Sequence, residues 1–195
     1  MAYPTVNAPY GFLPINRVDG MPYAGATRQY AINDAADIFH GDLVILAGGE
    51  IFPFTGTDSG YPLGVFMGAQ YVNSMGQTIQ GQYYPAGATN GVAYVVVDGQ
   101  AAYKVVVTDG SSVVDSSLTT AVIGQNIAVV LGTGSATTGD SGMSVEAGTE
   151  DDASTLPIKV IDVVPATKTA TGYPELVVKI NVAQFDNAAG VLPPA

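Results

Sequence analysis

The chain has 195 residues, 47% of them hydrophobic, and seventeen acidic against six basic side chains give it a net charge of −11. That acidity excludes a nucleic-acid binder, which needs a cationic footprint for phosphates, and it disfavours an anionic membrane surface as partner. With no cysteine, no tryptophan and His40 as the single histidine, the chain has little equipment for catalysis. We therefore expect no enzymatic activity and no cofactor.

Residues 1–30 differ from the rest of the chain in their recurring prolines. Each proline fixes its own backbone and pushes the preceding residue towards extended geometry, and they stand at Pro4, Pro9, Pro14 and Pro22. Large apolar side chains sit among them, whereas a frayed terminal tail, the alternative interpretation, is normally polar. We expect an extended N-terminal arm that docks on its own body or on a neighbouring molecule.

From residue 31 onwards the sequence consists of short apolar runs separated by Gly, Pro and Asp-Gly turn signals. The runs predict strands at residues 42–47, 51–54, 63–67, 69–72, 78–84, 92–97, 101–107, 127–131, 158–164 and 176–182. Helical evidence is confined to a turn or two at residues 33–39, with Asn33 or Asp34 as cap, and to residues 115–121, where strand or loop fits equally well. The expected fold class is all-β: a compact β-barrel or sandwich domain with a Pro-rich arm and little helix.

A Gly/Thr-rich run and an acidic cluster interrupt the strand pattern at residues 132–155. Their composition predicts a flexible loop, and the alternative is a connection between two lobes at residues 1–130 and 155–195. The C-terminal piece has only two clear strands, so we favour a single β domain over residues 31–195. The carboxylates lack the spacing of a calcium loop, so we expect no metal site at Asp140, Glu146, Glu150, Asp151 and Asp152.

The first residues carry neither the basic segment nor the apolar segment of a secretory signal. The longest apolar run, residues 92–97, is far shorter than the ~20 residues of a membrane-spanning helix. We expect a protein made in the cytoplasm with no membrane partner.

Several stretches resemble the capsid decoration, or cement, proteins of tailed bacteriophages. These are YGFLPINRVDG at residues 10–20, PLGVFMGAQY at 62–71, VAYVVVD at 92–98 and LVVKINVAQF at 176–185. The resemblance implies a compact β-barrel or β-tulip with extended arms. It also implies binding to the outside of the expanded capsid, often as a trimer at three-fold positions, where such proteins bridge neighbouring major capsid proteins.

The function that the resemblance implies is that of a virion structural protein clamping capsid subunits against internal DNA pressure. Its partners would be the major capsid protein and its own copies in a homotrimer, and its place the outer surface of the capsid. Arginine pairs with capsid carboxylates and aromatic side chains fill pockets, which makes the contact candidates Tyr3, Tyr10, Phe12, Arg17, Tyr23 and Arg28. The alternatives are a head-fibre or tail structural protein and a carbohydrate- or host-surface-binding β module.

Overall fold

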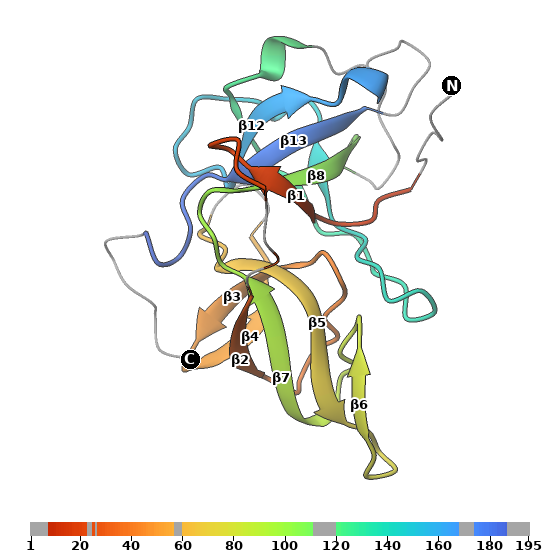
Figure 1. Cartoon of the computed structure of the whole chain (residues 1–195). Helices are drawn as coiled ribbons and strands as arrows, with labels where there is room; N and C mark the ends of the chain where they lie inside the picture. Colours follow the sequence, from red (N-terminus) through yellow and green to blue (C-terminus); the bar gives the residue numbers. More distant parts are fainter. Residues whose placement is uncertain are drawn as a thin grey trace.

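The computed structural model describes residues 8–22, 25, 27–56, 60–110, 120–167 and 174–186. The expected all-β fold is confirmed: these residues form thirteen strands and two short 3-10 turns, η1 (Thr120–Val122) and η2 (Pro165–Thr167), without an α-helix. The strands make two sheets, each curled into a barrel, and the barrels lie one above the other in Figure 1. No helix in the described part of the chain has the length and apolarity needed to cross a membrane.

The lower barrel of Figure 1 is a closed ring of five strands, paired in the order β3-β4-β2-β7-β5 and back to β3. A further strand, β6, extends β5 as a hairpin. The six strands are β2 (Arg28–Ile32), β3 (Leu43–Ala47), β4 (Glu50–Pro53), β5 (Gly64–Val72), β6 (Thr78–Gly81) and β7 (Thr89–Val96). Apolar residues from different strands, among them Val44, Phe66 and Val95, form its buried core.

The upper barrel is nearly closed. Its strands are β1 (Leu13–Arg17), β8 (Ala101–Thr108), β9 (Asn126–Ile127), β10 (Val129–Val130), β11 (Ser144–Glu146), β12 (Ile158–Val163) and β13 (Glu175–Ile180). The ring runs β10-β11-β8-β13-β12-β9, and only Ala128 separates its two end strands along the chain. β1 lies antiparallel on β8, and β11 pairs in parallel with the end of β8.

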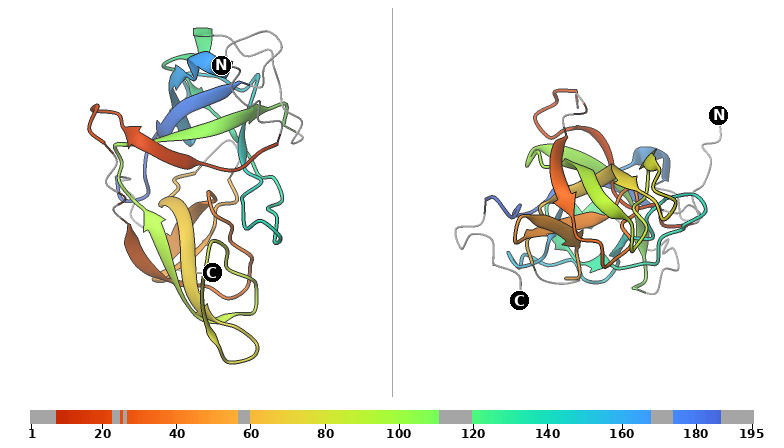
Figure 2. Two further views of the ribbon diagram at one scale, coloured as in Figure 1. Left: turned by 45° about the vertical axis from the view of Figure 1, so that its right-hand side comes forward. Right: turned by 90° about the horizontal axis from the view of Figure 1, so that it is seen from below.

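One hydrophobic cluster joins the two barrels. It contains Phe12, Tyr103 and Leu176 from the upper half of the molecule, together with residues of the lower barrel and its connections at Leu43, Phe54, Val65 and Val96. The strands pass from the upper barrel to the lower one after β1 and return after β7, and the left view of Figure 2 shows the barrels packed end to end. Because the cluster is continuous, we expect the two barrels to unfold together.

The described part of residues 1–30 packs on its own chain. β1 pairs with β8 through Leu13 and Lys104, and β2 pairs with β7 through Arg28 and Val95. The boundary expected between an arm and a body at residue 30 therefore falls inside β2. Phe12 and the strand pairing bind this segment to the barrels, so in its described part it is no free-standing arm.

Residues 132–155 also differ from the loop that their composition predicts. β11 lies inside this stretch, and Met143, Ser144 and Val145 are buried beside β8. The longer predicted strands are confirmed with shifts of one to three residues, and a turn at residues 73–76 closes β5 onto β6. Residues 33–39 form no helix; the Asn33 side chain instead accepts a hydrogen bond from the Ala35 N–H at 3.2 Å, which is an Asx-turn.

Candidate functional site

The inner half of the N-terminal segment is anchored in the body of the protein. Phe12 is fully buried in the cluster between the barrels. The Tyr10 hydroxyl donates a hydrogen bond to Glu175 Oε1, and Lys104 Nζ lies 3.2 Å from the same oxygen and 5.4 Å from the centre of the Tyr10 ring. Burial raises the pKa of Tyr10, and so does the hydrogen bond to Glu175. Tyr10 is thus a neutral donor that ties residues 8–12 to β13.

Close backbone contacts fix this anchored half next to the start of β3. The Gly11 N–H donates to the Met143 carbonyl at 3.1 Å, and the Phe12 N–H donates to the Gly41 carbonyl at 2.9 Å. Gly11 has a φ of +79°, and a Cβ placed there would lie 2.5 Å from the Cβ of Ser141. Only glycine fits such a position, because other residues are strained at this φ and no space is left for a side chain.

We call the contact of residues 11 and 12 with Gly41, Ser141 and Met143 the junction. A buried carboxyl group lies beside it. Asp42, at the end of the turn before β3, accepts hydrogen bonds from the Ser141 hydroxyl and from the Phe39 N–H, the latter at 2.8 Å. The Ser141 hydroxyl oxygen in turn accepts the Met143 N–H at 2.9 Å. Burial raises the pKa of Asp42 to about 6, against the lowering effect of both hydrogen bonds. The junction therefore holds a carboxyl group that titrates close to neutral pH.

The outer half of the segment presents aliphatic side chains to water. The register of β1 against β8 shifts between Pro14 and Asn16, so that Ile15 is the extra residue of a β-bulge. Ile15 and Val18 are each 38% exposed, and Met21 is 60% exposed. We call these three residues the β1 ridge.

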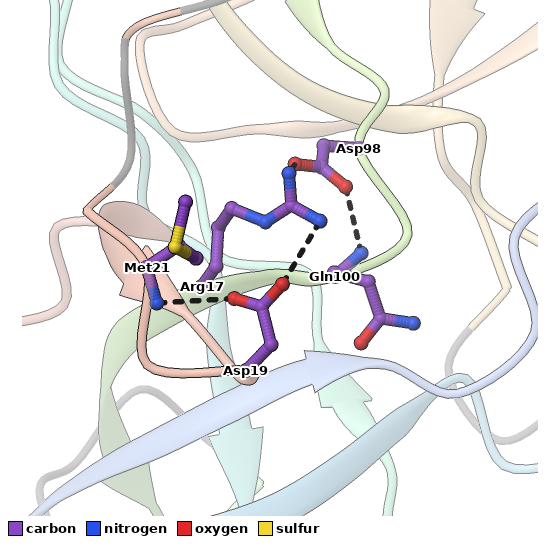
Figure 3. A network of polar contacts seen from close by, with 5 residues as sticks. All are labelled: Arg17, Asp19, Met21, Asp98 and Gln100. Atoms are coloured by element: carbon purple, nitrogen blue, oxygen red, sulfur yellow. Dashed lines mark hydrogen bonds and ion pairs between the residues drawn. The ribbon is translucent and has the colours of Figure 1, made fainter.

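Arg17 stands between Ile15 and Val18 in the sequence, and its guanidinium group lies near two carboxylates of its own chain (Figure 3). Its guanidinium nitrogens lie 3.2 Å from Asp19 Oδ2 and 3.5 Å from Asp98 Oδ2. Asp19 Oδ1 also accepts the Met21 N–H at 3.1 Å, and the Arg17 N–H donates to the Met21 carbonyl at 3.0 Å. The backbone bond closes residues 17–21 into a turn, and the two carboxylates more than balance the charge of the one arginine.

The six candidates predicted from the sequence fall into four groups. Tyr3 and Tyr23 lie outside the described residues. Phe12 is fully buried in the core and exposes no surface to a partner. The hydroxyl of Tyr10 is hydrogen-bonded to Glu175 within the chain. Arg17 is paired within the chain, whereas Arg28 is exposed and makes no ion pair with any described residue.

The sequence prediction does not include the β1 ridge, because it selects contact residues by the size of aromatic side chains and by the charge of arginine. The available signal was the aliphatic series Ile15, Val18 and Met21, which continues past the aromatic positions towards Pro22. Sequence alone does not show on which side of a strand a bulged residue will lie. The structure therefore removes Phe12 from the candidate contacts and adds these three exposed side chains, while Tyr3 and Tyr23 lie outside the described residues.

The single histidine lies near the anchored half of the segment. Burial lowers the pKa of His40, and the charge of Asp140 opposes this effect.

A groove of about 480 Å³ lies beside this region, and its lining includes Pro9, Tyr10, Thr133 and Ser141. The Ser141 hydroxyl donates a hydrogen bond to Asp42 and is therefore not free to act in the groove. Within the described ranges, no group of three His, Asp or Glu side chains is placed to hold a metal ion.

The arrangement combines exposed aliphatic side chains at the β1 ridge with an exposed arginine, Arg28, on β2 of the other barrel. The chain matches no known protein-family model, and neither a curated protein nor a solved structure is significantly similar to it.

Proposed function

We propose that this protein is a structural component of a virion that decorates the outer surface of the capsid and clamps adjacent major capsid protein subunits. The resemblance of its strand-and-turn motifs to phage decoration proteins suggests the role. The observation that carries the proposal is the β1 ridge, where Ile15, Val18 and Met21 are held in water by a backbone that is itself firmly bound. The three side chains stand within seven residues of the chain, and contiguous exposed apolar groups are typical of protein–protein contact sites.

The geometry of the ridge suits docking in two respects. The backbone of β1 is already fixed by pairing with β8, so little conformational entropy is lost when a partner covers it. The charge of Arg17 is already matched by Asp19 and Asp98, so covering the ridge does not leave an unpaired cation. Arg28, exposed on β2, is the side chain that would pair with a carboxylate of the capsid.

A clamp on a lattice gains affinity from repetition. Each further contact made by a protein already bound to the shell is effectively intramolecular, so modest single contacts give strong overall attachment. The two barrels, packed end to end in Figure 2, give the chain an extent over which two subunits can be contacted at once. In this proposal the upper barrel contacts one capsid subunit through the β1 ridge.

Co-sedimentation tests the proposal directly. The purified chain is mixed with shells of the major capsid protein encoded in the same genome and assembled without it, and saturable pelleting is expected. A variant with Ile15→Ser, Val18→Ser and Met21→Ser should bind at least about tenfold more weakly, because each buried aliphatic side chain contributes roughly 1.5–3 kcal/mol.

The matched control is Ile123→Ser, which removes an aliphatic side chain of similar exposure on the upper barrel, 43% against 38% for Ile15. It should bind like the unaltered chain. If the unaltered chain stays in the supernatant, the proposal is wrong. If the triple variant binds with unchanged affinity, the β1 ridge has no part in attachment.

A further inference from the structure

The most exposed apolar side chain that the structure describes lies far from the β1 ridge. Met75 is 81% exposed and stands in the turn between β5 and β6. This hairpin projects from the end of the lower barrel that is farthest from the β8–β13 pair, as Figure 1 and the left view of Figure 2 both show. A large thioether side chain is therefore held in water at one extremity of the molecule.

The turn that carries Met75 is rigidly built. Asn73 Oδ1 accepts the N–H of Met75 at 3.0 Å and that of Gln77 at 2.9 Å, and Asn73 Nδ2 donates to Gln77 Oε1 at 3.1 Å. The Gly76 N–H donates to the Asn73 carbonyl at 3.0 Å, at a φ of +75° that glycine adopts readily. The backbone at Met75 is thus set in advance, so inserting Met75 into a partner has to order its side chain but not the turn that carries it.

The hairpin is also uncharged, in a chain that is otherwise acidic. No Asp, Glu, Lys, Arg or His occurs between residues 59 and 97, although the whole chain carries −11. The exposed side chains around Met75 are amides and hydroxyls, at Gln70, Ser74, Gln77, Thr78 and Gln80. In the described part of the chain β6 pairs with β5 alone, so its outer edge keeps free hydrogen-bonding groups.

These features define the surface that the hairpin fits. A charged partner surface would lose its water against side chains that carry no opposite charge, and that desolvation opposes binding. An apolar socket ringed by neutral hydrogen-bonding groups meets Met75, the surrounding amides and the edge of β6 without this cost.

We infer that the β5–β6 hairpin is a second docking element, which inserts Met75 into an apolar socket on an uncharged protein surface. The inference rests on the proposed function, in which that surface belongs to the capsid subunit next to the one that binds the β1 ridge. The two contacts lie on different barrels, so one molecule would join two subunits.

Methionine oxidation distinguishes the two contacts in a single experiment. The full chain, free and bound to shells at saturation, is treated with hydrogen peroxide, and the oxidation rate of each methionine is followed by mass spectrometry. Met21 reports on the β1 ridge, Met75 reports on the hairpin, and the buried Met143 is the internal control. Binding should slow the oxidation of Met75 by at least about tenfold, since a socket excludes the oxidant.

The outcomes separate the inference from the proposed function. If the bound chain protects Met21 while Met75 oxidises at the free rate, the inference is overturned and the proposed function stands. If no chain binds to the shells, the proposed function fails and the inference fails with it. If Met75 becomes protected without shells as the protein concentration rises, its partner is a second copy of the chain, which also overturns the inference.

Two variants give an independent measurement of affinity for the shells. Met75→Ser should weaken binding by about ten- to hundredfold, the equivalent of one buried apolar side chain, while Ile123→Ser leaves it unchanged. Asn73→Ala keeps Met75 but removes the side-chain bonds that order the turn, so a smaller loss is expected. Unchanged binding of Met75→Ser would overturn the inference.

Discussion

The two halves of the N-terminal segment, residues 8–12 and residues 15–21, are close in the sequence but have different environments. In the first half, Phe12 is buried between the barrels and Tyr10 is bonded to β13. In the second half, the aliphatic side chains of the β1 ridge remain in water. The difference lies in what the backbone meets: Gly11 passes tightly against Gly41 and Ser141, whereas Gly20 has open space around it. The first half attaches the segment, and the second half is available to a partner.

Replacing Phe12 with Ala should produce the largest effect on stability. The side chain is fully buried in the cluster shared by both barrels, and truncations of this kind cost about 3–5 kcal/mol. Urea denaturation followed by tyrosine fluorescence would measure the change. Ile15→Ala, in the exposed half, should cost less than about 1 kcal/mol. Equal losses for the two variants would contradict the division of the segment into anchored and free halves.

Replacing one glycine in each half with alanine tests the same comparison. Gly11→Ala places a methyl group 2.5 Å from the Ser141 Cβ at a φ of +79°, so strain and overpacking together should cost about 2–4 kcal/mol. Gly20→Ala meets a similar φ of +82° with no atom within 4 Å and should cost only about 1 kcal/mol. Thermal unfolding of both variants measures the two losses of stability. A loss for Gly20→Ala as large as that for Gly11→Ala would show that backbone strain alone, and not the tight junction, fixes this segment.

The carboxyl group of the junction should make stability depend on pH. Burial raises the folded-state pKa of Asp42 to about 6 from an ordinary value of 3.8, so between these values the folded chain binds a proton that the unfolded chain has lost. The stabilisation from this proton is present at low pH and is lost as the pH rises through about 6. Relative to Asp42→Asn, the unaltered chain should therefore lose up to about 3 kcal/mol of unfolding free energy between pH 4 and pH 7.

Denaturation of both proteins across this pH range tests the prediction. Ser141→Ala is a useful third protein, because the Ser141 hydroxyl lowers the pKa of Asp42 and its removal should move the transition to higher pH. A difference between the unaltered chain and Asp42→Asn that is the same at every pH would show that Asp42 does not titrate in this range.

The smallest effect is expected in the free half. Arg17→Gln removes both ion pairs, to Asp19 and to Asp98, but the arginine side chain is 36% exposed and pairs of this kind contribute about 0–1 kcal/mol. Denaturation at low and at high salt measures the change, which should shrink as salt is added. A loss above about 2 kcal/mol would mean that the turn of the β1 ridge contributes to the core as the anchored half does.

Strand length explains how much of the fold the sequence could predict. β5, β7, β8, β12 and β13 are runs of six to nine residues, rich in Val and Ile, and their own composition predicts them. The run predicted as one strand at residues 127–131 is divided at Ala128 into β9 and β10, which pair with different strands. β11 has three residues, no apolar run predicts it, and it exists because β8 and β10 pair with it. β1 contains Pro14, which argues against a strand; it is tolerated here because β1 pairs with β8 alone.

The sequence and the structure point to the same N-terminal segment as the candidate site but not to the same residues in it. The sequence singled out the N-terminal segment and its arginines, and Arg28 is exposed as a contact residue requires. It gave no means of seeing that Phe12 would enter a core made mostly of residues more than ninety positions away, such as Tyr103 and Leu176. The bulge that turns Ile15 outward depends on the register with β8, which local sequence does not specify.

A cryo-electron map of shells saturated with the protein tests the central claim most directly. The account predicts that the β1 ridge faces the shell, with Met21 covered by capsid density and Phe12 still inside the body of the decorating molecule. A map in which Ile15, Val18 and Met21 face solvent while another side of the protein touches the capsid would contradict it.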